Sequence, residues 1–305
     1  MTESIHKYFK VGLISFMAYP ANMHGEDPDI VDVINKVATD DYFDAIEVNG
    51  IKDAGKRAEV AKLLDTAHMT VCYGAQPRLL TTGLNPNDMN EEGRGKAEAT
   101  LIEAIDEAEE LGAKGIAFLA GKWRPETRDA QYAQLLKTAR NLCGYAAAKE
   151  MSVELEVFDY DIAKASLIGP APLAEKFAAD MRTTHSNFGL LIDLSHIPMT
   201  NESPEFVVRT LRPYLTHFHI GNTVCENPAC EGYGDEHQRF GFPGGSNDTR
   251  EVLSFLRVLR DEGFFDSENP YVLSFEVKPW KDEDPDLVVA GAKRVLNRAW
   301  ALLED

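Results

Sequence analysis

The chain has 305 residues, 44% of them hydrophobic, and a formal net charge of −19. This length is enough for one large core and suits a (β/α)₈ barrel, which needs roughly 250 residues. The acidity argues against nucleic acids and anionic membrane surfaces as partners, because binding to either depends on clustered Lys and Arg side chains.

The N-terminal segment MTESIHKYFKVGLISFMAYP lacks the basic start and cleavage site of a secretory signal. We expect its apolar run to be the first strand. No stretch approaches the roughly 18 consecutive apolar residues that span a bilayer. Four irregularly spaced cysteines fit no common zinc motif: Cys72, Cys143, Cys225 and Cys230. We therefore expect reduced thiols and a cytoplasmic protein.

Eight short runs rich in β-branched and aromatic residues alternate with longer helical patterns, which indicates parallel βαβ units. The predicted strands are, in chain order, Lys10–Met17, Phe43–Val48, Met69–Gly74, Lys114–Leu119, Ser152–Phe158, Phe188–Leu194, Leu215–Ile220 and Tyr271–Val277. Between them, apolar residues recur at spacings of three and four, as they do on one face of a helix.

Two helices carry further signals. The pattern is clearest from Glu91 to Leu111, and Gly112 follows it as a helix stop. Its apolar face comprises Ala97, Leu101, Ile105, Ala108 and Leu111. A second helix is predicted over Asp29–Val37, with Pro28 in its first turn.

Eight strand–helix units predict an α/β fold, a (β/α)₈ TIM barrel that spans residues 1–305 as a single domain. The alternative is an open doubly wound sheet, which more often has a Gly-rich phosphate turn after the first strand. The segment SFMAYPANMHG at that place contains no G-x-G-x-x-G, so the barrel is favoured.

One segment interrupts the alternation of strands and helices. It runs from Ile220 to Asp248, after the seventh strand, and a helix is expected to begin near Thr249. Loops of this length without their own pattern are usually functional or disordered. The aromatic residues of this loop and its Gly- and Pro-rich turns favour an ordered cover over the active site.

Side chains at the carboxyl ends of barrel strands line the active site in this fold. The last four predicted strands end in an acid or an imidazole: Glu156 in VELEVFDYD, Asp193 in FGLLIDLSH, His219 in LTHFHIGN and Glu276 in YVLSFEVKPW. A buried carboxylate is costly unless it is paired or bound to a metal. Three acids and one imidazole suit Mn²⁺, Mg²⁺ or Co²⁺. The competing interpretation is that these residues form ion pairs with Lys and Arg inside the barrel.

The motifs LEV, D-x-x-H, H-x-H and FEV on strands five to eight resemble the xylose isomerase-like barrel superfamily, which includes sugar phosphate isomerases/epimerases and ketose 3-epimerases. The resemblance covers the whole chain in topology, and its specificity lies in these strand ends. It implies that the metal is bound by Glu156, Asp193, His219 and Glu276. It also implies that His196 of D-x-x-H contacts the substrate. Arg239 in RFGFPGG matches a substrate-binding Arg of the family, although it lies further from His219 than in the epimerases.

A narrower resemblance concerns the catalytic α subunit of bacterial C-glycoside deglycosidases. It rests on LEVFDYD, LIGPAP, DLSHIPM, HFHIGN, YGDEHQRFGFPGGSND and SFEVKPW. It implies a 3-oxo-glucosyl C-glycoside as substrate, Mn²⁺ as the metal and a small β-sandwich partner subunit, hence a hetero-oligomer. The extended aromatic loop after His219 departs from small-sugar epimerases and suits a bulky, flavonoid-like aglycone. We favour this interpretation over the ketose 3-epimerase.

Both interpretations require loss of a C–H proton next to a carbonyl, with a cation stabilising the developing negative charge. In the epimerase, Glu156 and Glu276 would act on opposite faces of the sugar. In the deglycosidase, a base removes the C2 proton and the aglycone carbon leaves by β-elimination. His196 is the first candidate for this base, and His237 is a second candidate that could also bind substrate. Asp159 is a candidate for binding sugar hydroxyls.

Two other function classes are compatible with the fold. Endonuclease IV-type barrels, which share this superfamily, cleave phosphodiesters, but they need several more metal-binding histidines and a basic groove. A non-catalytic sugar-binding barrel would need no metal at all.

Overall fold

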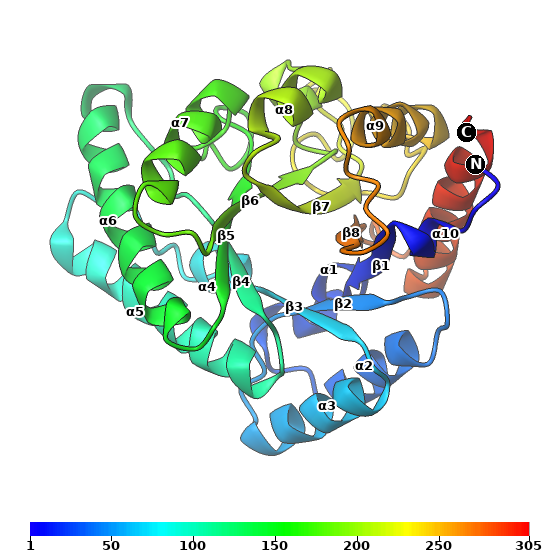
Figure 1. Cartoon of the computed structure of the whole chain (residues 1–305), viewed down its shortest axis with the longest axis horizontal. Coiled ribbons are helices and arrows are strands. Elements are labelled where there is room, and N and C mark those ends of the chain that lie inside the picture. Colours follow the sequence, from blue (N-terminus) through cyan, green and yellow to red (C-terminus); the bar gives the residue numbers. More distant parts are fainter. Residues whose placement is uncertain (305) are drawn as a thin grey trace.

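The computed structural model describes residues 1–304 and shows a closed barrel of parallel strands inside a ring of helices (Figure 1). The strands pair in chain order, and β8 pairs with β1 to close the barrel. The strands are β1 (Phe9–Ile14), β2 (Ala45–Val48), β3 (Thr70–Gly74), β4 (Gly115–Leu119), β5 (Ser152–Val157), β6 (Phe188–Asp193), β7 (Leu215–Gly221) and β8 (Tyr271–Glu276).

At least one helix follows each strand and packs on the outside of the barrel (Figure 1). The α-helices are α1 (Ser15–Ala18), α2 (Ile30–Ala38), α3 (Ala54–Thr66), α4 (Gln76–Leu80), α5 (Glu91–Glu110), α6 (Arg128–Ala147), α7 (Ala171–Arg182), α8 (Pro204–Leu211), α9 (Thr249–Asp261) and α10 (Pro285–Leu302). Short 3-10 helices are η1 (Ile5–Lys7), η2 (Pro20–His24), η3 (Pro125–Thr127) and η4 (Pro198–Thr200).

The core follows from the burial of the strands on both sides. Every residue of β6 is buried, because the helices cover its outer side and the barrel interior covers its inner side. Helix α5 buries one face through Ala97, Leu101, Ala104, Ile105 and Ala108. Asn90 caps its first turn by accepting a hydrogen bond from the Glu92 N–H, and Gly112 follows with a positive φ. Because all eight strands are parallel, their carboxyl ends lie on one face of the barrel.

The eight predicted strands and the α5 helix are confirmed, although several of their ends differ from the prediction by one to three residues. Two boundary corrections have a clear cause. β1 ends at Ile14 rather than at Met17, because Ser15 begins the short helix α1 and its Oγ donates a hydrogen bond to the Glu47 carbonyl. Helix α2 begins at Ile30, one residue later than predicted, because the Asp27 side chain accepts from the Asp29 N–H and forms a turn there. Pro28 therefore lies before the helix.

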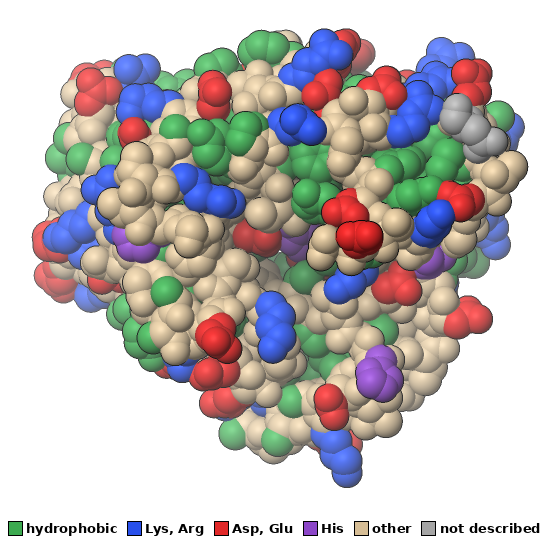
Figure 2. Space-filling view, viewed as in Figure 1, with side chains coloured by type: hydrophobic (Ala, Val, Ile, Leu, Met, Phe, Trp, Pro, Cys, Tyr) green, Lys and Arg blue, Asp and Glu red, His purple; other side chains and the backbone are tan. Residues whose placement is uncertain are grey.

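The two ends of the chain lie side by side (Figure 1). The Trp300 indole N–H donates to the Glu3 carbonyl at 2.8 Å. On the face drawn in Figure 2, acidic and basic side chains are interspersed around the rim. Within residues 1–304, no helix combines the length and the apolar character that crossing a bilayer requires.

Candidate metal centre

The ends of β5, β6, β7 and β8 bring the four predicted metal-binding residues together. One donor atom each from Glu156, Asp193, His219 and Glu276 lies within 4.8 Å of the other three, and all four side chains are buried. Asp193 and His219 are register partners on the neighbouring strands β6 and β7. Residues that are far apart in the sequence thus form one compact cluster because they lie near the carboxyl ends of adjacent strands.

The chemistry of this cluster fits a divalent cation. Oε1 of Glu156 is buried and has no hydrogen-bond partner. Nδ1 of His219 lies 2.8 Å from Oε2 of Glu276 and 3.5 Å from Oε1 of Glu156. Burial raises the pKa of Glu276, and the nearby His237 only partly opposes this. Among residues 1–304, no Lys or Arg forms an ion pair with the three acids of the cluster. The contacts therefore favour a metal site over the competing interpretation of ion pairs with Lys and Arg.

Glu47 contacts Nε2 of His219, the ring nitrogen that does not face the other donors. Its Oε1 lies 3.0 Å from Nε2 of His219 and 3.0 Å from Nε2 of His217. Burial raises the pKa of Glu47, but the two imidazoles outweigh burial and hold it well below its usual range. Accepting the Nε2–H of His219 places the lone pair on Nδ1, which is the nitrogen that faces the other donors. Glu154 completes the arrangement at 3.1 Å from Nδ1 of His217.

A second network joins two histidines through Asp235. Oδ1 of Asp235 lies 3.1 Å from Nε2 of His196 and 2.8 Å from Nε2 of His237. Burial lowers the pKa of both imidazoles, but Asp235 and the neighbouring acids outweigh it and raise the values to about 10 and about 9, respectively. Nζ of Lys164 contacts the other oxygen of Asp235 at 3.0 Å. Asp235 thus connects the charged groups of a network that lies beside Glu156, Asp193, His219 and Glu276, the four residues called the metal cluster below.

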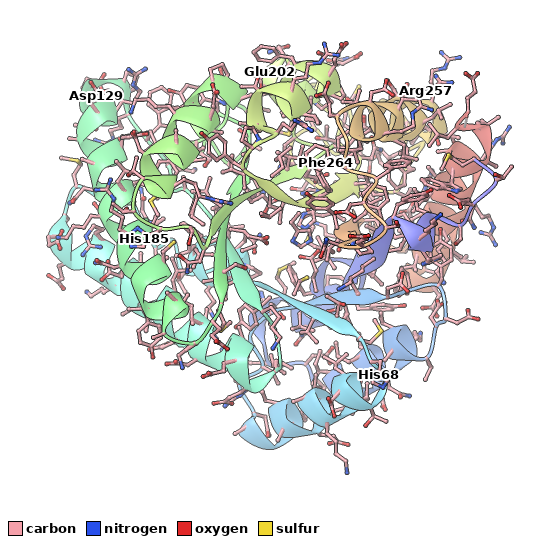
Figure 3. All side chains as sticks on the ribbon, in the orientation of Figure 1. His68, Asp129, His185, Glu202, Arg257 and Phe264 are labelled. Atoms are coloured by element: carbon pink, nitrogen blue, oxygen red, sulfur yellow. The ribbon has the colours of Figure 1, made fainter. Side chains whose placement is uncertain are left out.

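Half of the histidines gather at the centre of the barrel. The buried ones are His196, His217, His219 and His237. In contrast, His68 and His185 lie among the outer elements (Figure 3). Histidines distributed by chance would lie mostly at the surface. The burial of four imidazoles among acids therefore indicates a functional site.

A cavity of about 190 Å³ opens above the cluster. Its polar lining includes Glu156, His219, Asp235, His237, Glu276 and Lys278. Its apolar lining includes Ile14, Phe16, Met17, Met23 and Phe158. The Nε2 amide of Gln76 donates to Oε2 of Glu156 at 2.7 Å and so fixes this carboxylate. A small polar molecule in this cavity would meet the metal cluster on one side and apolar walls on the other.

The long loop after β7 contributes to this cavity. Asn222 and Asn247 join its two ends, because the Asn247 N–H donates to Oδ1 of Asn222 at 2.8 Å. Asp248 then begins α9 with a capping box that includes Glu251. Asp235, Glu236 and His237 of this loop line the cavity, which agrees with the prediction that the loop covers the active site.

Comparison with known proteins places this arrangement in a family. Residues 35–293 match the family described as Xylose isomerase-like TIM barrel. The chain belongs to this family. A comparison with curated protein sequences gives no match.

Three solved structures of the same fold are similar to this xylose isomerase-like barrel. A D-tagatose 3-epimerase-like protein is 20% identical, with a TM-score of 0.72, and 96% of this chain and 99% of that chain are covered. The 3-keto-D-glucoside 4-epimerase from E. coli is 17% identical, with a TM-score of 0.67 and coverage of 95% and 99%. The IOLI protein, whose structure holds a bound zinc atom, is 15% identical, with a TM-score of 0.67 and coverage of 96% and 96%.

Two of the predicted substrate-binding residues have other partners in this member of the family. Nε of Arg239 donates to Glu283 at 2.8 Å, and its guanidinium lies over the Phe242 ring, away from the residues that line the cavity. The Asp159 carboxylate accepts backbone N–H groups from four residues of the following loop, Ile162 to Ala165. These contacts give no support for a substrate contact by either side chain.

His196 lies behind the cavity rather than on its wall. Its Nδ1 is 3.1 Å from the Val157 carbonyl and its Nε2 contacts Asp235, so both ring nitrogens have partners. His237, in contrast, lines the cavity. The structure therefore brings His196 next to the metal cluster but gives His237 the direct access.

Sequence reasoning did not identify Asp235 or Lys164. Both lie in loops, where no strand position marks them as inward-facing. The one available signal for Asp235 was its place two residues before His237 in GYGDEHQ. Lys164 carried no signal, because a Lys in a loop is ordinarily exposed.

Proposed function

We propose that this chain is a divalent-metal-dependent, carbohydrate-active enzyme that removes a C–H proton next to the ketone of a sugar. The observation that carries this proposal is the convergence of Glu156, Asp193, His219 and Glu276 at the base of a cavity that also contains His237. A bound cation there would stabilise the negative charge that develops on the sugar oxygen when the adjacent carbon loses its proton. A substrate of this kind also agrees with the sugar epimerases among the similar structures.

The favoured cation is Mn²⁺, with Mg²⁺ or Co²⁺ as alternatives. Three carboxylates and one imidazole supply mainly oxygen donors, and this donor set suits these ions. The zinc atom bound in the IOLI structure supports a metal in a protein of this fold without fixing which metal this chain prefers.

Our specific proposal is C-deglycosidation of a 3-oxo-C-glucoside by β-elimination. A base takes the C2 proton, and the electron pair of that C–H bond forms the enolate. The enolate then expels the aglycone, and the C1–aglycone bond breaks with its electron pair on the aglycone carbon, which an acid protonates. The products are the free aglycone and an unsaturated 3-oxo sugar, so no oxidant or reductant is needed.

Within this proposal, His237 is the base that takes the C2 proton at the cavity wall. His196 contacts Asp235 and holds it in place next to His237. His237 is preferred because it lines the cavity, whereas His196 does not. The Asp235 carboxylate, 2.8 Å from Nε2 of His237, orients that ring.

The alternative is a ketose 3-epimerase. The presence of both Glu156 and Glu276 in the cavity lining favours it, because two carboxylates can exchange a proton with opposite faces of one carbon. The D-tagatose 3-epimerase-like structure is a relative with that type of substrate in its name.

Two further features belong to the deglycosidase proposal. We propose a small β-sandwich partner subunit and hence a hetero-oligomer, on the strength of the sequence resemblance. We also propose a cytoplasmic location, which the four free cysteine thiols support. The net charge of −19 supports a small-molecule substrate over a nucleic acid, although an AP endonuclease has the same fold.

One preparation of the protein, assayed with different substrates, distinguishes these activities. The Mn²⁺-loaded protein is incubated with a 3-oxo-C-glucoside, with and without a co-purified partner subunit, and separately with D-psicose and D-tagatose. Aglycone release supports deglycosidation, whereas ketose interconversion without aglycone release would reject it in favour of the epimerase. Sugar binding that is independent of any divalent metal, with no turnover, would leave only a binding protein.

A further inference from the structure

A second cavity, of about 510 Å³, lies beside the metal cavity. Leu80 and Lys164 line both cavities, so the two spaces meet at these side chains. The larger cavity is bounded by the loops that follow β3, β4 and β5, on the same face of the barrel as the metal cluster. A molecule bound at the metal cluster could therefore extend into it.

The wall of this second cavity is largely apolar. Its apolar residues include Leu79, Leu80, Leu84, Pro86, Leu119 and Ala163. Leu80 at the junction is 46% exposed, which leaves an apolar side chain available to a ligand. The volume lies within the roughly 300–1,000 Å³ that is usual for small-molecule sites.

A third cavity also meets the metal cavity but has a different character. It measures about 220 Å³ and shares Met23 and Pro77 with the metal cavity. Charged residues line it: Lys52, Arg78 and Glu107. An apolar group attached to a sugar would therefore favour the Leu80 side over this one, because an apolar group displaces water from charged side chains without offering them hydrogen bonds.

The walls of the apolar cavity are held in place by hydrogen bonds. The side-chain amides of Asn85 and Asn87 both donate to the Lys122 carbonyl at 2.9 Å. The Gly121 N–H donates to Oδ1 of Asn87 at 2.6 Å. A side chain at Gly121 would collide with the Asn85 amide group and displace it, so glycine permits this close approach. The cavity is thus formed before a ligand arrives, which lowers the entropic cost of binding.

Asp159 holds in place the part of the wall that the loop after β5 forms. Its carboxylate accepts the N–H groups of Ala163 at 2.8 Å and of Lys164 at 2.7 Å. The loop after β5 therefore presents Ala163 to the apolar cavity and Lys164 to the junction. The Lys164 ammonium is held by Asp235 at 3.0 Å, so its stem, rather than its charge, is free to line the cavity.

We propose that this apolar cavity, defined by Leu79, Leu80, Leu84, Pro86, Leu119 and Ala163, binds the apolar aglycone of a two-part substrate whose sugar occupies the metal cavity. The inference deepens the proposed function and rests on it for the position of the sugar. The apolar wall, the shared junction at Leu80 and the fixed loops each support it. Lys164 would mark the position of the bond between sugar and aglycone.

The test measures binding of a free aromatic probe, so that it does not depend on turnover. The flavone apigenin is titrated into the full-length chain, with and without Mn²⁺, and binding is followed by calorimetry. Leu84→Asp places a charge on the apolar wall and should weaken binding at least about tenfold. Thr82→Asp is the matched control, because Thr82 lies in the same segment but lines the charged cavity, and it should change binding less than about twofold. Leu80→Asp is a second variant at an exposed position, in case Leu84→Asp does not fold.

The outcomes are distinguishable. No saturable binding to the unaltered chain, or equal weakening by the Leu84 and Thr82 variants, would overturn the cavity assignment. If apigenin binds as expected but no 3-oxo-C-glucoside is cleaved, the aromatic site stands and the proposed reaction fails. If a 3-oxo-C-glucoside is cleaved and its KM is unchanged in Leu84→Asp and in Leu80→Asp, the reaction stands and the aglycone site is rejected.

Discussion

Replacing Glu47 with Gln should weaken metal binding although Glu47 is outside the set of proposed metal ligands. The buried Glu47 carboxylate lies 3.0 Å from Nε2 of both His217 and His219. Gln keeps the shape but removes the charge and offers only one neutral acceptor oxygen. A hydrogen bond to a charged group contributes about 1.5–3 kcal/mol and a neutral one about 0.5–1.5 kcal/mol, so the loss should be about 1–2 kcal/mol.

This loss corresponds to a rise of about 5–30-fold in the Kd for Mn²⁺, which overlaps the range typical of residues that orient metal-binding histidines. The measurement is a Mn²⁺ titration by calorimetry, with thermal unfolding of the metal-free protein as a check on folding. Glu154→Gln is the matched control, because Glu154 contacts His217 but not His219. It should change the Kd less than about threefold. Equal effects of the two variants, or an unchanged Kd in Glu47→Gln, would refute the role given to Glu47.

Three further predictions concern residues outside the metal cluster. Asp159→Asn should lower the free energy of unfolding by about 1–3 kcal/mol, measured by urea denaturation, because an amide cannot accept all the loop N–H groups that the carboxylate accepts. Arg239→Ala should leave kcat/KM within about threefold in steady-state assays, because its guanidinium pairs with Glu283 away from the cavity. For His6, the hydrogen bond to Asp44 raises the pKa above its ordinary value of 6.5 despite partial burial. The stability that His6 contributes is therefore complete below pH 6.5 and is lost as the pH rises through the raised folded-state value. The difference in unfolding free energy between the unaltered chain and His6→Asn should shrink accordingly.

Each of these has a contrary result. Unchanged stability of Asp159→Asn would mean that the loop does not depend on the carboxylate. A large loss of kcat/KM in Arg239→Ala would restore the substrate contact that the family resemblance implied. A pH-independent effect of His6→Asn would show that the His6–Asp44 contact does not depend on the charge of the imidazole.

The sequence was sufficient to predict the fold and the metal cluster, because both depend on regular positions. β-branched runs mark the strands, and Glu156, Asp193, His219 and Glu276 occupy equivalent strand ends that a closed barrel must bring together. The end of β1 was missed, because the four-residue helix Ser15–Ala18 is too short for a periodic pattern.

The loop residues could not be placed by the same reasoning. The sequence shows that the segment after β7 is long, but not which of its side chains turns inward, because irregular backbone has no fixed side-chain period. Asp235 reaches His196 and His237 through such backbone, and Arg239, a few residues further on, turns away to Glu283. Asp159 was interpreted as a sugar contact because it follows a strand end, yet it organises its own loop.

Anomalous diffraction at the manganese edge, from crystals grown with Mn²⁺, shows whether a cation binds among the four donors. We expect one strong peak per chain at roughly 2.0–2.3 Å from donor atoms of Glu156, Asp193, His219 and Glu276. The absence of a peak, or a peak held by Glu47 and His217 instead, would contradict this expectation.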